Sequence, residues 1–300
     1  MSKAVSPSCD KPYGLARVCR VWAVSRATMY RRASASASEA PRTSCRRGPK
    51  TAWSDEQLTA LIREDLASSP WVGEGHRKVW ARLRSKTVRT SLRRVLRLMR
   101  EATLLAPHRN KRVLGPYVHD GSIIPDRANV MWGTDATCTL TLEDGQVTVF
   151  AAIDHCTAEC VGIHAAKPGT RFEALEPLHQ GVRARFGAVG RDVAKGLKVR
   201  HDHGSQYTSD AFQEQVEFLG MESSPSFVRA PEGNGCIERF FRTLKEQLLW
   251  LKAFKNVEEL RLALHAWAKL YNEQWLIERH GFITPIQARR ALEAKEAKAA

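Results

Sequence analysis

The chain of 300 residues is strongly basic, with 47 Lys and Arg against 32 Asp and Glu and a formal net charge of +15. Apolar residues make up 43% and charged residues 26%, as in ordinary globular proteins. No run of eighteen apolar residues is present, and residues 1–14 lack an apolar core. Composition therefore excludes a membrane span and a secretory signal, and we expect a cytoplasmic protein without a membrane partner.

The positive charge is unevenly distributed along the chain. Residues 1–130 contain 26 Lys and Arg against 10 Asp and Glu, whereas residues 131–300 contain 21 against 22. A basic half joined to a nearly neutral half favours a nucleic-acid-binding region attached to an ordinary domain. The alternative that charge alone leaves open is a solvated or disordered basic arm.

Seven cysteines are scattered through the chain, and their odd number argues against a disulfide framework. Cys156 and Cys160, with His155 and His164 nearby, raise the alternative of a zinc site. No second Cys/His pair stands at finger-like spacing, so free thiols packed in a strand are the favoured interpretation.

Residues 1–32 are predicted to contain two short helices around a turn near residues 23–25. The apolar residues expected to pack the first helix are Val18, Val21 and Trp22. The basic residues expected to face outward from the second helix are Arg26, Arg31 and Arg32. This arrangement is typical of a helix-turn-helix whose second helix contacts DNA. Residues 33–50, rich in Ala, Ser, Pro and Arg, are predicted to be a linker.

A second helical unit is predicted over residues 51–106. Ser54 and Gln57 have the spacing of a helix capping box. Apolar residues then recur at helical spacing, and the last helix carries basic residues on its opposite face, namely Arg93, Arg94, Arg97 and Arg100. We interpret the unit as DNA-binding, with Arg93 and Arg97 as contacts. A plain helical bundle with a solvated basic face is the alternative.

After a connector over residues 107–128, the pattern changes to that of an α/β domain over residues 129–300. Two β-rich runs flank Asp144-Gly145, which predicts a hairpin. The remaining predicted elements are a strand at 160–165, a helix at 171–186, a strand at 197–201, a helix at 209–219, a strand at 221–224 and a long helix from about Cys236. This order predicts helices layered on one mixed sheet.

Three acidic residues occupy suggestive places in this domain. Asp135 lies inside a predicted strand, Asp202 follows another strand, and Glu238 begins the helix after a glycine-rich loop. Each one alone is more often structural than catalytic. Three carboxylates that converge would repel one another without cations, and their natural ligand is Mg²⁺ or Mn²⁺.

Sixty-six residues lie between Asp135 and Asp202, and thirty-five lie between Asp202 and Glu238. With this spacing the chain resembles the DDE transposase and retroviral integrase superfamily. It most resembles the larger, second-frame transposase of insertion sequences that use two overlapping reading frames. The segments that carry the resemblance are residues 75–80, 95–100, 132–137, 201–207, 234–245 and 281–285.

The resemblance implies a ribonuclease-H-like core in which Asp135, Asp202 and Glu238 bind the metal. It implies cleavage and joining of DNA at the ends of an insertion sequence, a reaction that two ions can promote. The expected partners are terminal inverted repeats, target DNA and further copies of the chain in a homo-oligomer. Fusion to an upstream-frame protein stays open. The chain departs from retroviral integrases in lacking their zinc-binding N-terminal His/Cys domain.

The helix that begins near Cys236 is expected to have two distinct faces. Its apolar residues should pack on the sheet, and these are Ile237, Phe240, Phe241, Leu244, Leu248 and Leu251. Glu238, Arg242 and Lys245 share the other face, so Arg242 and Lys245 are expected to contact DNA beside the metal. The resemblance also implies a DNA contact for Lys245. The alternative for this face is a surface Glu–Arg pair beside a solvated lysine.

Two other functions compete with the transposase interpretation. One is a nuclease on the same ribonuclease-H-like fold, but such an enzyme does not need a basic N-terminal region. The other is a DNA-binding regulator without catalysis, which does not need three acids at this spacing. A strand-transfer assay with Mg²⁺ distinguishes all three functions.

Overall fold

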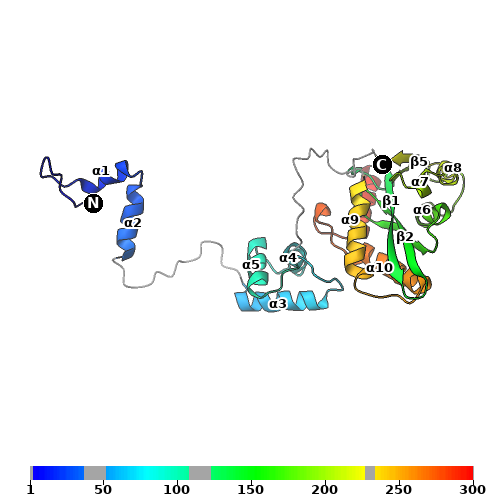
Figure 1. Cartoon of the computed structure of the whole chain (residues 1–300), viewed down its shortest axis with the longest axis horizontal. Coiled ribbons are helices and arrows are strands. Elements are labelled where there is room, and N and C mark those ends of the chain that lie inside the picture. The colour runs from blue at the N-terminus through cyan, green and yellow to red at the C-terminus, as the bar shows by residue number, and fades with distance from the viewer. Residues whose placement is uncertain (1–2, 37–51, 108–122, 227–233, 300) are drawn as a thin grey trace. The chain divides into compact units, whose positions relative to one another are not determined.

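A computed structural model describes residues 3–36, 52–107, 123–226 and 234–299. Two compact units, residues 1–52 and 53–300, are each described by themselves (Figure 1). Most of the predicted linker and connector, residues 37–50 and 108–122, lies outside the described residues. No helix in the described ranges combines the length and the apolar character needed to cross a bilayer.

The first unit contains α1 (Gly14–Val21) and α2 (Arg26–Ser36), so the predicted helix pair is present and α2 extends past residue 32. The expected packing of α1 is wrong, because Val21 is 76% exposed and Trp22 62% exposed, and Cys19 is the buried residue. Two short helices offer too little surface to enclose a core.

The helical part of the second unit consists of α3 (Asp55–Ser68), α4 (His76–Ser85) and α5 (Leu92–Glu101). The predicted capping box at Ser54 and Gln57 is present, with each side chain bonded to the other residue's backbone N–H. The three helices share a core of Leu58, Ile62, Val79, Leu83, Val88, Val95, Leu98 and Met99. A continuous apolar core explains why these short helices pack together.

The rest of this unit is built on one five-stranded sheet with the order β3-β2-β1-β4-β5. The strands are β1 (Met131–Thr141), β2 (Gly145–Asp154), β3 (Cys160–Ala166), β4 (Lys198–His201) and β5 (Glu222–Pro225). The first three form an antiparallel meander, and β4 and β5 add in parallel. The predicted mixed sheet is confirmed, and its order is that of a ribonuclease-H-like fold.

Both faces of the sheet are covered by helices (Figure 1). Alternate residues of β2 point to opposite faces, so Val149 and Ala151 join one core while Phe150 and Ala152 join the other. The first face is covered by α9 (Gly235–Leu244) and α10 (Val257–Gln274). The second is covered by α6 (Arg171–Phe186) and α8 (Asp210–Phe218).

Helix α6 approaches the sheet closely at Gly162 of β3. A Cβ atom at Gly162 would collide with the backbone carbonyl of Pro177 in α6. Backbone atoms cannot move aside as the end of a flexible side chain can, so the helix itself would have to shift. Glycine at this position therefore allows the close contact between α6 and β3.

We expect Gly162→Ala to lower the free energy of unfolding by about 1–3 kcal/mol, the usual cost of overpacking a well-packed core. Urea unfolding followed by circular dichroism measures the change. The matched control is Gly190→Ala, where an added Cβ meets Val193 at an ordinary 3.5 Å. Equal stabilities of the two variants would contradict the proposed role of Gly162.

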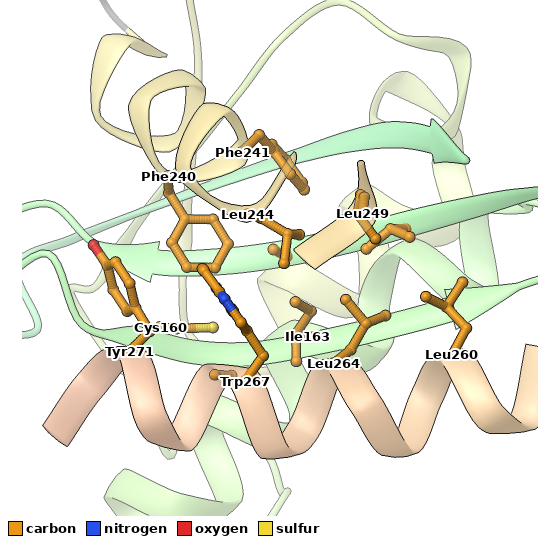
Figure 2. Close-up of a cluster of buried hydrophobic side chains, with 14 of the residues drawn as sticks. Cys160, Ile163, Phe240, Phe241, Leu244, Leu249, Leu260, Leu264, Trp267 and Tyr271 are labelled. Atoms are coloured by element: carbon orange, nitrogen blue, oxygen red, sulfur yellow. The ribbon is translucent and has the colours of Figure 1, made fainter. Parts of the chain in front are cut away.

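A π-helical turn, η2 (Lys245–Leu249), follows α9 directly, and the Trp250 N–H donates to the Lys245 carbonyl at 2.9 Å. Figure 2 shows Phe240, Phe241, Leu244 and Leu249 pointing into the core shared with α10. The expectation that Leu251 packs on the sheet is wrong, because Leu251 is 55% exposed and Leu249 is buried instead. The wider π turn changes the helical phase beyond Lys245.

The remaining elements complete the fold. They are the short helix α7 (Ser205–Thr208), the 3₁₀ turn η3 (Glu278–His280) and the C-terminal helix α11 (Pro285–Ala299). The predicted loop between β5 and α9 lies outside the described residues at positions 227–233.

Candidate active site

Asp135 lies within β1 on the sheet face that α9 covers. It stands opposite Ala151 in the antiparallel register, and Ala151 belongs to the core beneath α9 and α10. The side chain is half-buried, and its Oδ1 accepts a hydrogen bond from the Ala136 N–H at 2.8 Å. A carboxylate in these surroundings is costly unless its charge is compensated.

Asp202 lies beside Asp135 because of the way β4 pairs with β1. Met131 stands opposite Lys198 and Gly133 opposite Arg200 in this parallel pair. The same register, continued by two residues, places Asp202 level with Asp135, and neighbouring strands run about 5 Å apart. Two acids separated by sixty-six residues of sequence are thus neighbours at one end of the sheet.

The turn after β4 holds Asp202 through its neighbours. The Gly204 N–H donates to Asp202 Oδ1 at 2.9 Å. His201 Nδ1 donates to the Asp202 carbonyl at 2.6 Å, which leaves Nε2 to accept from the Ser223 hydroxyl at 2.9 Å. A Cβ on Gly204 would lie 3.0 Å from Asp202 Oδ1. His201 and Gly204 contact Asp202, and although both lie in the segment 201–207 that carries the resemblance, the sequence analysis assigned them no role.

Glu238 and Lys245 come to Asp135 from α9 and the π turn after it. Helix α9 packs against β1 and β2, and Glu238 is exposed in its first turn. Lys245, at the end of α9, is partly exposed. The negative charge of Glu238 raises the pKa of Asp135 and the positive charge of Lys245 lowers it. Helix α9 and the π turn thus bring one carboxylate and one ammonium group toward Asp135.

The pKa of Asp135 is raised to about 6, and burial is the largest cause. The negative charges of Asp202 and Glu238 raise it further, while the Ala136 N–H and Lys245 oppose the shift. All three predicted acids therefore act electrostatically at one place. Within the described ranges, however, no three His, Cys, Asp or Glu side chains are close enough to hold a metal ion as they stand, and this includes Cys156 and Cys160.

We expect Asp135→Asn to raise the free energy of unfolding near pH 7.5, because the neutral amide removes a disfavoured charge. The folded pKa of about 6 exceeds the model-peptide value of 3.8. The cost of ionisation is therefore absent below about pH 4, grows between about pH 4 and 6, and is complete above about pH 6. The stabilisation gained from Asp135→Asn should therefore decrease as the pH falls from about 6 to about 4.

Urea unfolding of the two proteins at several pH values from 4 to 8 measures this gain. Asp210→Asn is the control, because it removes a carboxylate from the exposed first turn of α8. A gain from Asp135→Asn that is constant across the pH range would contradict the shifted pKa.

Tyr207 is fully buried close to Asp135 and Asp202. Its ring stacks on His201 with centroids 5.7 Å apart and meets Phe212 edge-on at 5.3 Å. Burial, followed by the charge of Asp135, raises the pKa of the Tyr207 hydroxyl well above its usual value. The phenol therefore stays neutral and contributes packing behind Asp135 and Asp202.

The predicted DNA contacts are placed in different environments. Arg26, Arg31 and Arg32 are exposed on α2, and Arg93 is exposed on α5. Arg97 is instead partly buried, paired with Asp55 at 2.6 Å and Glu101 at 2.8 Å. Arg242 is exposed and pairs with Glu246 at 3.2 Å. A DNA contact through Arg97 would have to break these ion pairs.

Comparison with known families places the sheet domain in one class of protein. The family described as "Integrase core domain" matches residues 125–231 and, in a second form, residues 219–285. The family described as "HTH-like domain" matches residues 53–112, which include α3, α4 and α5. The fold and these matches thus define an integrase core domain that is preceded in the sequence by an HTH-like domain.

Curated relatives narrow this class. The "Transposase for insertion sequence element IS629" of Shigella sonnei is 28% identical over 73% of this chain and 75% of its own length. "Transposase InsD for insertion element IS2A/D/F/H/I/K" of Escherichia coli is 27% identical over 62% and 65%. The chain carries an integrase core domain over residues 125–231 and 219–285, and it is similar to these insertion-sequence transposases.

These alignments do not span the relatives completely. The chain covers 55% of the "Insertion element IS2A uncharacterized 48.2 kDa protein" of Escherichia coli, at 27% identity over 73% of this chain. The solved structures to which this chain is similar include a simian T-cell lymphotropic virus intasome, with a TM-score of 0.46 and 15% identity over 79% of this chain and 74% of that chain. The catalytic core of BIV integrase has a TM-score of 0.41 and 17% identity over 57% and 99%.

Proposed function

We propose that this chain is a transposase that cleaves DNA at the ends of an insertion sequence and joins those ends to target DNA. Asp135, Asp202 and Glu238 are its catalytic residues and hold one or two Mg²⁺ or Mn²⁺ ions. The observation that carries this proposal is the register of β1 and β4, which sets Asp202 level with Asp135, while α9, with Glu238 in its first turn, packs against β1. Like charges are seldom gathered at a structural position without a cation to offset them.

The residues present fit a hard divalent ion. Carboxylate oxygens are the donors that Mg²⁺ prefers, and the mutual repulsion of three carboxylates favours a bound cation. The acids converge without forming a closed cluster, so metal and DNA phosphate oxygens would complete the set together. When bound, such ions supply activation of the attacking oxygen and neutralisation of charge on the leaving oxygen.

The chain's own residues supply positioning around these acids. His201 and Gly204 orient Asp202, and Tyr207 closes the space behind it. Lys245, close enough to act on Asp135, would hold a DNA phosphate beside the metal through its ammonium group. No side chain is needed as a covalent nucleophile, since water or a DNA 3′-hydroxyl is the attacking group.

A strand-transfer assay tests the proposed function. The substrate is a duplex that ends in the inverted repeats flanking the gene, incubated with the full chain, target plasmid and Mg²⁺. We expect joined products that disappear when EDTA replaces Mg²⁺. Cleavage without joining would indicate a nuclease, and binding without either product would indicate a regulator.

The partners belong to the same proposal. The basic residues 1–130 would bind the terminal repeats, and several copies of the chain would assemble on paired ends. The proposal on partners also includes fusion of this chain to an upstream-frame protein. Light scattering of the protein with and without terminal DNA measures the assembly.

A further inference from the structure

The basic side chains of the α3–α5 unit divide into two groups. One group is paired internally: Arg82 with Asp65 at 2.8 Å and Glu74 at 2.6 Å, and Lys86 with Asp65 at 3.0 Å. Asp65 and Glu74 are buried, so these pairs hold the helices together. Their charge is already neutralised within the protein.

The second group gathers at the turn between α4 and α5. Arg84 and Arg89 are exposed there, and neither forms an ion pair with any residue that the structure describes. Together with Thr87 and Thr90 they line a cavity of about 450 Å³. Among the residues that the structure describes, the cavity lining thus combines two positive charges without an ion pair and two hydroxyl groups, with no acid.

The wall of this cavity is held by Trp80. The indole N–H of Trp80 donates to the Thr90 carbonyl at 2.9 Å, and the Arg84 guanidinium lies over the Trp80 ring, 5.4 Å from its centroid. These contacts fix both ends of the turn on one rigid side chain. A preformed arrangement lowers the entropic cost of binding a ligand.

The hydroxyl of Thr90 lacks a partner. Its Oγ1 atom is buried and forms no hydrogen bond with the described residues, an arrangement that costs stability. Thr90 immediately precedes Ser91, the residue that caps the N-terminus of α5. The positive end of a helix favours an anion at this position. Thr90 therefore brings an unpartnered hydroxyl to the same cavity that Arg84 and Arg89 line with positive charge.

We propose that this cavity binds a phosphodiester group of the DNA backbone, with Arg84 and Arg89 as charge partners and the Thr90 hydroxyl as a donor. The inference rests on the proposed function and specifies how the helix-turn-helix-like unit holds DNA. A single phosphate contacted at this turn would fix the orientation of the unit on the duplex without reading its sequence.

Binding of the full chain to a 30-base-pair duplex of arbitrary sequence tests the site, with fluorescence anisotropy in EDTA between 50 and 200 mM KCl. We expect Arg84→Ala/Arg89→Ala to weaken binding at 50 mM KCl by roughly tenfold. The slope of log K against log salt should become shallower by about 0.9 for the lost phosphate. The matched control, Arg183→Ala/Arg290→Ala, removes two exposed charges outside residues 1–130 and outside the cavity, and it should change binding less than about threefold.

Thr90→Val separates a ligand contact from a structural role. The methyl group removes the unpartnered hydroxyl at constant shape, so we expect equal or greater stability together with weaker DNA binding. A second pair of variants compares Thr87→Gly with Thr103→Gly. Both threonines follow a helix with positive φ, +64° and +58°, but only Thr87 lines the cavity. Both changes should stabilise the fold, and only Thr87→Gly should weaken DNA binding.

Equal losses in the two double-arginine variants would overturn the proposal. Stabilisation by millimolar inorganic phosphate that needs Arg84 and Arg89, with DNA binding unchanged in their absence, would also overturn it, because the site would then hold a free anion. Binding in EDTA does not depend on catalysis. Failure of strand transfer would therefore not contradict the phosphate site. Failure of the binding test would likewise not contradict the catalytic role of the three acids.

Discussion

Asp135→Asn, Asp202→Asn and Glu238→Gln should each reduce Mg²⁺-dependent cleavage and strand transfer by more than about 100-fold. Each amide keeps the shape of the side chain and removes the charge that would hold the ion. Loss of a group that only orients a metal ligand already costs about 10–100-fold, so loss of a ligand should cost more. The duplex assay with terminal repeats and target plasmid measures both reactions.

The three variants should still bind DNA, because the acids are not part of the basic surface. Anisotropy with the same duplex checks this and shows that the variants are folded. Asp210→Asn is the activity control, since Asp210 lies in the exposed first turn of α8. Near-normal turnover by any one of the three variants would remove that residue from the active site.

The largest effect on stability is expected at a buried ionic network around the turn between β2 and β3. Glu159, in the turn between β2 and β3, is 3% exposed and pairs with Arg185 of α6 and Arg289 of α11. Arg289 is 4% exposed and also lies 3.9 Å from Asp154. Asp154 accepts hydrogen bonds from the backbone N–H groups of Asn129 and Thr157, both at 2.7 Å.

Glu159→Ala should lower the free energy of unfolding by about 3–5 kcal/mol, the usual cost of leaving one partner of a buried pair uncompensated. Arg289, which is 4% exposed, would be left with only Asp154 at 3.9 Å as an acidic partner among the described residues. Guanidinium chloride unfolding of the full chain measures the loss. We also expect α11 to become accessible to proteolysis before the rest of the core.

Glu222→Ala is the matched control, because it breaks an ion pair with Lys198 whose side chains are 47% and 60% exposed. Exposed pairs of this kind contribute about 0.2–1 kcal/mol. If Glu159→Ala were no more destabilising than Glu222→Ala, the network would not anchor α11.

Local patterns predicted the elements of the catalytic core closely. The amphipathic run at residues 171–186 is a helix with the same bounds, and the hairpin around Asp144-Gly145 joins β1 to β2 as expected. Such elements depend on side-chain spacing and turn chemistry within a few residues, which the sequence displays directly. The three acids were recognised by their spacing and by the family resemblance.

Packing across the fold decided what these patterns could not. The pairing of Arg97 with Asp55 joins residues from α5 and α3, so a basic helix face that suggested DNA contacts turned out to be partly internal. Leu251 shows the opposite change: helical periodicity predicted that it packs in the core, but after the π turn that follows Leu244 it is exposed. Neither outcome follows from helical periodicity, because each depends on a partner distant in the chain or on a local change of helix type.

The sequence by itself determined the class of fold and the basic character of residues 1–130, and it predicted the three acids, because each depends on the order and spacing of residues. Only the tertiary structure decided that Asp135 and Asp202 are neighbours, since their meeting depends on the parallel register of β1 and β4. It also decided which arginines stay unpaired. Arg82 pairs with the buried acids Asp65 and Glu74, whereas Arg84 and Arg89 have no such acid within reach among the described residues, and these distances exist only after the helices have packed.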